Sequence, residues 1–154
     1  MLLQEQYLPF HLIVNETKST PIRIVYNGSA RTKRENNSIN DCLLKGVNLL
    51  SKMLPILLRI RMNKTLILAD IEKAFHQIGL KSTERNYLRF LWYENATDNT
   101  AMKKIVTYRF CRVPFGIISS QFILAAVIIF LLKQNITKFT ELILNHLYLS
   151  LIHI

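Results

Sequence analysis

The alternation of hydrophobic and polar positions predicts several short strands. Runs that are rich in β-branched and aromatic residues, and bounded by turn residues, predict extended segments over 7–14, 22–26, 66–69, 87–93 and 105–112. The last two runs are separated by one polar loop, which favours a β-hairpin. The run 66–69 is short and wholly apolar, as in a strand that is buried on both faces.

Three longer stretches have the spacing of helices. Apolar residues recur with helical period over 48–61, although Pro55 interrupts this pattern. An interior proline costs a helix about 3 kcal/mol, so we expect a kink there or two shorter helices. A second helix is predicted over 117–133, where the apolar run is too short to span a bilayer comfortably and fits a buried helix. A last helix is predicted to be capped by Thr140.

Turn and helix-capping residues separate these predicted elements. Asn27-Gly28-Ser29 and Pro114-Phe115-Gly116 are typical of turns. Ser38, followed three residues later by Asp41, resembles a capping box, in which each residue satisfies backbone or side-chain groups of the other.

Charge adds a functional constraint. The chain has 154 residues, half of them hydrophobic, and a formal net charge of +10. Of its 20 Lys and Arg residues, 18 precede Val113. A basic surface of this kind favours a polyanionic partner such as nucleic acid, with a solubility surface or attraction to an anionic membrane as alternatives.

The two cysteines indicate a compartment rather than a metal site. Cys42 and Cys111 lie far apart and match no metal-ligand spacing. The first residues lack the basic start and apolar core of a secretory signal. We therefore expect reduced thiols and an intracellular, cytoplasmic location.

Asp70 is the candidate catalytic group. It follows the predicted strand 66–69, so the pattern delivers a carboxylate to the edge of a hydrophobic sheet. A carboxylate in such a place is usually paired, hydrogen-bonded or bound to a metal. The alternative is an ordinary turn residue that caps the next helix.

Six stretches in a fixed order point to a family. From about Leu8 to Phe122 the chain reads LPFHLIV, IRIVYNGSA, SINDCLLKG, ADIEKAFHQI, RFLW and YRFCRVPFGIISSQF. Together they resemble the reverse transcriptase (RNA-directed DNA polymerase) of BEL/Pao-type LTR retrotransposons. The resemblance implies an α+β fold of partial fingers and palm, with an antiparallel sheet and helices packed on one face. It implies one incomplete domain, with fingers at about 1–45 and 78–114 and palm at about 46–77 and 115–154.

The resemblance assigns a metal site. Asp70 matches the first catalytic aspartate, which with the backbone at Ile71 would hold Mg²⁺. Two-metal nucleotidyl transfer requires hard oxygen ligands, because Mg²⁺ prefers carboxylates and phosphates in octahedral geometry.

The resemblance also assigns a nucleotide pocket. Arg23 would clamp the incoming deoxynucleotide, since a guanidinium pairs bidentately with phosphate oxygens. Phe75 would be the steric gate beneath the sugar. Phe115 and Gly116 would pack on the nucleotide and template, and Lys18 would be a second fingers cation.

Five further cations are implied contacts to the nucleic-acid backbone. They are Arg31, Lys33, Arg34, Arg109 and Arg112. Such contacts would be independent of sequence and sensitive to salt. The implied partners are an RNA or DNA template–primer, deoxynucleotides and the remainder of a retrotransposon polyprotein, without stable membrane insertion. For each cation a solvated face is the alternative interpretation.

The match fails at the second acidic site. The family has a Tyr-x-Asp-Asp hairpin after the buried helix, whereas here Tyr148 is followed by Ser150 and Leu151 at the aspartate positions. One carboxylate cannot hold two cations about 4 Å apart. We therefore expect a fragment that does not polymerise alone. The alternatives are a non-catalytic nucleic-acid-binding module and a small basic membrane-associated protein.

Overall fold

The computed structural model describes residues 7–16, 21–94 and 104–148, and within them the chain is mixed α/β. These residues form three α-helices and two small antiparallel sheets. The chain divides into two compact units. Unit 1 comprises residues 1–44 and 75–120, and unit 2 comprises residues 45–74 and 121–154.

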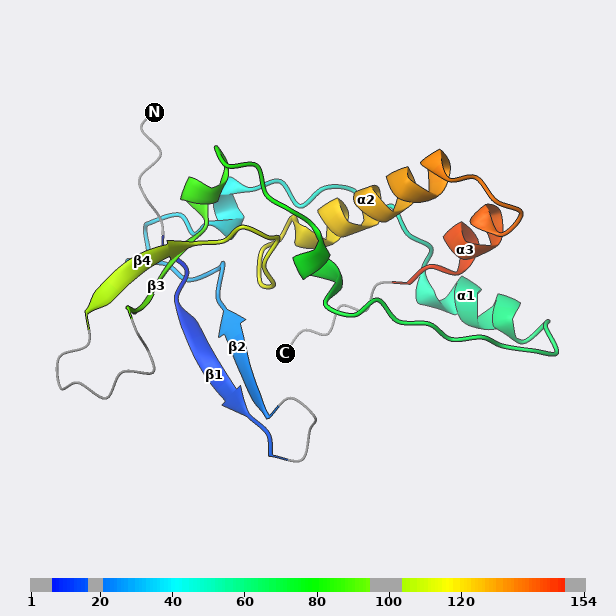
Figure 1. Ribbon diagram of the computed structural model, residues 1–154, viewed down its shortest axis with the longest axis horizontal. Coiled ribbons are helices and arrows are strands. Elements are labelled where there is room, and N and C mark those ends of the chain that lie inside the picture. The colour runs from blue at the N-terminus through cyan, green and yellow to red at the C-terminus, as the bar shows by residue number, and fades with distance from the viewer. Residues whose placement is uncertain (1–6, 17–20, 95–103, 149–154) are drawn as a thin grey trace. The chain divides into compact units, whose positions relative to one another are not determined.

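Unit 1 contains two β-hairpins (Figure 1). Each sheet has two antiparallel strands, which are β1 (Phe10–Val14) with β2 (Ile22–Tyr26), and β3 (Arg89–Tyr93) with β4 (Ile105–Arg109). The predicted strand at 22–26 is confirmed to the residue, and the other three form over shorter spans than predicted. The two hairpins meet where the backbone N–H of Leu8 donates to the carbonyl of Arg89 at 2.8 Å.

Aromatic rings pack the two hairpins together. Alternate residues of a strand face the same side, so Phe10 and its cross-strand partner Tyr26 share one face of their hairpin. Phe10 contacts Trp92 with ring centroids 5.1 Å apart, and Tyr26 contacts Phe90 at 5.5 Å and Phe110 at 4.8 Å. Burial among these rings raises the pKa of the Tyr26 phenol.

Beside these rings lies the small apolar core of unit 1. Its buried residues are Leu8, Ile39 and Ile117, against which Tyr26, Leu88 and Phe110 pack. The core therefore draws one residue from each of three segments that are distant in the sequence.

The side-chain amide of Asn40 joins three segments of unit 1. Its Nδ2 donates to the hydroxyl of Ser29 at 3.0 Å and to the carbonyl of Gly116 at 3.1 Å. Its Oδ1 accepts from the backbone N–H of Ile118 at 2.9 Å, and its own N–H donates to the carbonyl of Gly28 at 3.0 Å. Asn40 thus forms hydrogen bonds to both of the turns that the sequence predicts.

The predicted capping box is confirmed, although it begins only a short 3-10 turn, Asn40–Cys42. The carboxylate of Asp41 accepts from the N–H of Ser38 at 2.8 Å and from its hydroxyl at 2.6 Å. Arg31 adds an ion pair to the same oxygen at 2.9 Å. The hydrogen bonds from Ser38, with the charge of Arg31, lower the pKa of the Asp41 carboxyl.

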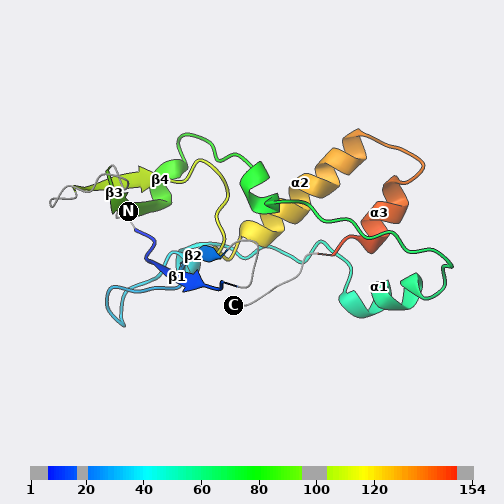
Figure 2. The ribbon, with the colours of Figure 1, turned by 60° about the horizontal axis from the view of Figure 1, so that its bottom comes forward.

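Unit 2 contains the helices (Figure 2). They are α1 (Met53–Ile60), α2 (Ser120–Gln134), whose first residue belongs to unit 1, and α3 (Thr140–His146). Arg59 of α1 donates from Nη2 to the carbonyl of Asn145 in α3 at 2.9 Å, which joins these two helices.

The prediction for the first helix was wrong about Pro55. The helix begins at Met53 instead of residue 48, which places Pro55 in its first turn rather than in its interior. Backbone N–H groups of a first turn have no helical partner, so a proline there removes no hydrogen bond. No kink is required.

The other two helices also begin differently from the prediction. The helix that follows Gly116 begins at Ser120 rather than residue 117, because Ile118 is engaged by Asn40. Thr140 is the first residue of α3 rather than its cap, and its hydroxyl accepts from the N–H of Thr137 at 2.8 Å.

The predicted strand at 66–69 does not form. Thr65–Asp70 has no regular secondary structure, and Ile67 and Leu68 are 86% and 82% exposed. A strand requires a neighbour, and none of the described segments pairs with this one. Both sheets are antiparallel, as expected, and both lie in unit 1. The described residues of unit 2 form no sheet, so the expected palm sheet with helices on one face stays a prediction.

Replacing Asn40 by Ala should destabilise the protein by about 1–2 kcal/mol, because the groups that its amide joins lose their hydrogen bonds. Urea unfolding followed by tyrosine and tryptophan fluorescence measures this change. Asn37→Ala, a matched change on an exposed asparagine in the same loop, should alter the midpoint little. Equal effects of the two substitutions would contradict the role given to Asn40.

Stability should also depend on the charge of Asp41. Its pKa is lowered from 3.8 in the folded state. Its contribution is therefore present above pH 3.8 and is lost as pH falls through the lower folded value. The difference in unfolding free energy between the native chain and Asp41→Asn should shrink as pH falls from 6 to about 2. A constant difference over that range would show that ionisation of Asp41 is not involved.

Candidate nucleic-acid interface

Two phenylalanines that are distant in the sequence meet in unit 1. Phe75 lies on the 3-10 turn Ala74–Gln77, and Phe115 lies in the turn before α2. Their ring centroids are 4.6 Å apart at an interplanar angle of 71°, an edge-to-face contact. His76 contacts Phe115 in the same way at 5.5 Å. Phe115 keeps half of its surface exposed, so one apolar ring is offered to solvent.

A short backbone pairing positions this contact. The N–H of Leu80 donates to the carbonyl of Cys111 at 2.9 Å, and the N–H of Val113 donates to the carbonyl of Ile78 at 3.0 Å. These bonds hold the segment after Phe75 antiparallel to the segment before Phe115, with Gly79 opposite Arg112. The sequence pattern predicts a strand that runs as far as Arg112, but it predicts no strand over 78–80, so it does not predict this pairing.

The backbone at Gly116 comes close to another part of the chain. Its φ of +86° lies in the left-handed region, which residues with a side chain rarely adopt. A Cβ there would collide with the backbone oxygen of Tyr26. A Cβ on Gly28 would in turn lie 2.5 Å from the carbonyl of Gly116. In the structure, Gly116 therefore serves the junction of the two turns.

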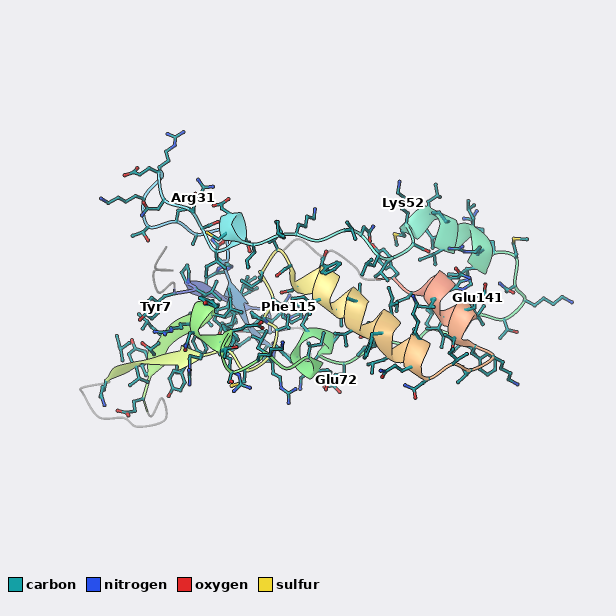
Figure 3. All side chains as sticks on the ribbon, turned by 90° about the horizontal axis from the view of Figure 1, so that it is seen from above. Tyr7, Arg31, Lys52, Glu72, Phe115 and Glu141 are labelled. Carbon is teal, nitrogen blue, oxygen red and sulfur yellow. The ribbon has the colours of Figure 1, made fainter. Side chains whose placement is uncertain are left out.

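Three of the five candidate backbone cations hold protein partners. Arg31 is paired with Asp41, on the loop that extends away from the strands (Figure 3). Arg109 donates from Nη1 to Oδ1 of Asn86 at 2.8 Å, and Arg112 donates to the carbonyl of Gln77 at 3.3 Å. These bonds orient each guanidinium and leave it exposed to solvent.

Lys33 and Arg34 lie on the exposed loop between the first predicted turn and the capping box. Their surroundings are those of solvated cations, which fits either of the two interpretations of their role.

Sequence reasoning missed Arg89 as a candidate contact to a nucleic-acid backbone. It stands directly opposite Arg109 in the β3–β4 ladder. Like charges in such a pair repel, and an anion between them would reduce that repulsion. Asn86 steadies both residues, since its carbonyl accepts from Nε of Arg89 at 2.9 Å. What identifies Arg89 is its position opposite Arg109 in the strand register, which the sequence alone does not fix.

Of the remaining nucleotide-binding candidates, Arg23 and Lys18, the structure describes only Arg23. Arg23 is exposed on β2, opposite Ile13, on the other face from Tyr26. Among the described residues its guanidinium has no hydrogen bond or ion pair. Lys18 lies outside the residues that the structure describes.

Asp70 and Ile71 lie in unit 2, in an exposed segment without regular structure. The expected position at the edge of a buried sheet is therefore wrong. No three His, Cys, Asp or Glu side chains gather into a metal-binding group anywhere in the described part of the chain. The acidic residue that follows Asp98 in the sequence is Glu141 alone. Ser150 and Leu151 fall outside the described residues. Of the two predicted metal-site residues, Asp70 alone carries a carboxylate, whereas a two-magnesium site uses several.

Comparison with protein-family models, with curated proteins and with solved structures finds no match. Among residues 7–16, 21–94 and 104–148, no helix has both the length and the apolar character needed to cross a bilayer.

Gly116→Ala should destabilise unit 1 by roughly 1–3 kcal/mol, because a side chain is strained at this φ and meets the backbone of Tyr26. Gly79→Ala is the matched control in the same unit. Its added Cβ would meet only Nη1 of Arg112, at an ordinary 3.7 Å. Chemical unfolding of both variants tests the difference, and a Gly79 variant as unstable as the Gly116 variant would contradict the explanation.

Proposed function

We propose that the chain is a reverse-transcriptase-like fragment that binds an RNA or DNA template–primer, and its deoxynucleotide, without joining them. The observation that carries this proposal is the contact between Phe75 and Phe115. The sequence resemblance assigns both residues to one nucleotide pocket, and they meet although they come from separate segments. The exposed ring of Phe115 could stack on a base, which is a sequence-tolerant contact.

The order of the two units supports the resemblance. The chain passes between units at residues 44/45, 74/75 and 120/121. The resemblance places the changes between fingers and palm at about 45/46, 77/78 and 114/115. An interleaved arrangement with crossings so near these positions is what a fingers-and-palm fragment would have.

The basic side chains of unit 1 support a polyanionic partner. Arg89, Arg109 and Arg112 come from two neighbouring segments, and each is oriented by a hydrogen bond to the protein. Orientation lowers the entropy that a long side chain loses when it binds a phosphate. These contacts would follow the sugar–phosphate backbone and carry no sequence preference.

The lone carboxylate is the reason for proposing binding without synthesis. Nucleotidyl transfer by two metal ions requires several carboxylates to offset the repulsion between the cations. Asp70 is exposed, and among the described residues it belongs to no group of three or more potential metal ligands.

Phe115→Ala should weaken binding of a fluorescent RNA–DNA hybrid by roughly tenfold, the typical effect of losing one base–aromatic stack. Fluorescence anisotropy measures the affinity at several salt concentrations. Affinity of the native chain should fall steeply with salt, because bound cations release counterions from the phosphates. Phe115→Ala should leave the salt slope unchanged, since it removes no charge.

Phe139→Ala is the matched control, because Phe139 is 53% exposed against 50% for Phe115 and lies in unit 2. Equal losses in both variants, with both folded by circular dichroism, would contradict the assigned interface. Primer extension with Mg²⁺ and deoxynucleotides should give no product. Incorporation that depends on Asp70 would overturn the claim of inactivity.

A further inference from the structure

The segment Lys64–Asp70 has the composition of a strand and none of its hydrogen bonds. In the described part of the chain, no backbone N–H or carbonyl from Lys64 to Asp70 has a protein partner. Its apolar side chains are open to solvent, with Leu66 53%, Ile67 86% and Leu68 82% exposed. The segment thus combines an unpaired backbone with an apolar surface.

One kind of partner would both pair this backbone and cover its apolar side chains. Backbone groups along an extended segment pair with those of another extended segment, which at the same time covers its side chains. Segments of this kind, without proline or glycine and rich in leucine and isoleucine, pair readily when their edge is open.

We propose that Lys64–Asp70 pairs with the same segment of a second copy of the chain, antiparallel about Ile67. This register places Ile67 opposite Ile67 of the second copy, and Leu66 opposite Leu68 twice. It also places Lys64 opposite Asp70 at both ends. The segment is therefore complementary to itself in both hydrophobicity and charge, as a two-fold symmetric interface requires.

Charge complementarity selects this register over others. Parallel pairing in register places Lys64 opposite Lys64 and Asp70 opposite Asp70, and like charges directly opposite are unfavourable. An antiparallel shift of two residues brings Lys64 opposite Glu72, but it places Asp70 opposite Leu66. Glu72 also lies 3.4 Å from the ammonium group of Lys73.

Pairing of this segment would be independent of nucleic-acid binding, because only the backbone and charges of one exposed segment are involved. It assigns Asp70 a partner, Lys64 of the second copy, that the described chain does not itself supply.

Cross-linking through position 67 tests the register. In the full chain with Cys42→Ser and Cys111→Ser, Ile67→Cys should form a disulfide-linked dimer under mild oxidation. Residues directly opposite each other in an antiparallel pair have Cα atoms about 4.5–5.5 Å apart, within disulfide reach. Leu44→Cys, at a position 90% exposed, is the control for random collision. We expect roughly tenfold faster dimerisation for Ile67→Cys, and equal rates would overturn the proposal.

Charge reversal in the Ile67→Cys background tests the end pairs. Lys64→Glu alone and Asp70→Lys alone should each slow cross-linking by roughly tenfold, because every end pair becomes repulsive. Lys64→Glu with Asp70→Lys should restore the original rate, since the charges are exchanged. Failure of the double variant to recover, while its circular dichroism matches that of the native chain, would overturn the pairing. So would cross-linked products in which the cysteine introduced by Ile67→Cys is joined to a different protein.

Discussion

The four hydrogen bonds of Asn40 are the constraint from which the arrangement of unit 1 follows. Its amide and backbone hold the turn after β2, through Gly28 and Ser29, against the turn that contains Gly116. The two turns come so close that neither glycine could carry a side chain in place. Ile39 and Ile117, the neighbours of these contacts, are then buried with Leu8 in the core. Polar satisfaction and apolar burial therefore occur at the same point and reinforce each other.

Local signals predicted those elements whose partner lies nearby in the sequence. The strand Ile22–Tyr26 and the hairpin of β3 and β4 formed where alternation and turn residues indicated them. The capping box of Ser38 and Asp41 formed because its two members are three residues apart. The segment 66–69 had an equally good strand pattern and failed, because a strand depends on a neighbour that its own residues do not specify.

The resemblance proposed the residues of the candidate site, and only part of their geometry could be predicted. The resemblance named Phe75 and Phe115, and the pairing of 78–80 with 111–113 is what makes them neighbours. The sequence pattern predicted a strand as far as Arg112 but none over 78–80, so sequence reasoning could not have derived the contact. The same limit hid Arg89, which gains interest only from its register with Arg109. Asp70 was placed wrongly because its position was inferred from a strand that is not formed.

The two units differ in how far they satisfy their own backbone. In unit 1, even the short segments around Gly79 and Arg112 are paired with each other. Asn40 provides hydrogen-bond partners for backbone groups that the turns leave unpaired. In unit 2, the segment Lys64–Asp70 has strand-forming residues, exposed apolar side chains and, among the described residues, an unpaired backbone. Water can satisfy those backbone groups but cannot offset the exposure of leucine and isoleucine side chains. These side chains favour burial. Pairing with another extended segment would cover them and would also give the backbone groups hydrogen-bond partners. Lys64–Asp70 therefore combines, in one segment of unit 2, the exposed apolar side chains and the unpaired backbone that pairing with another extended segment would cover.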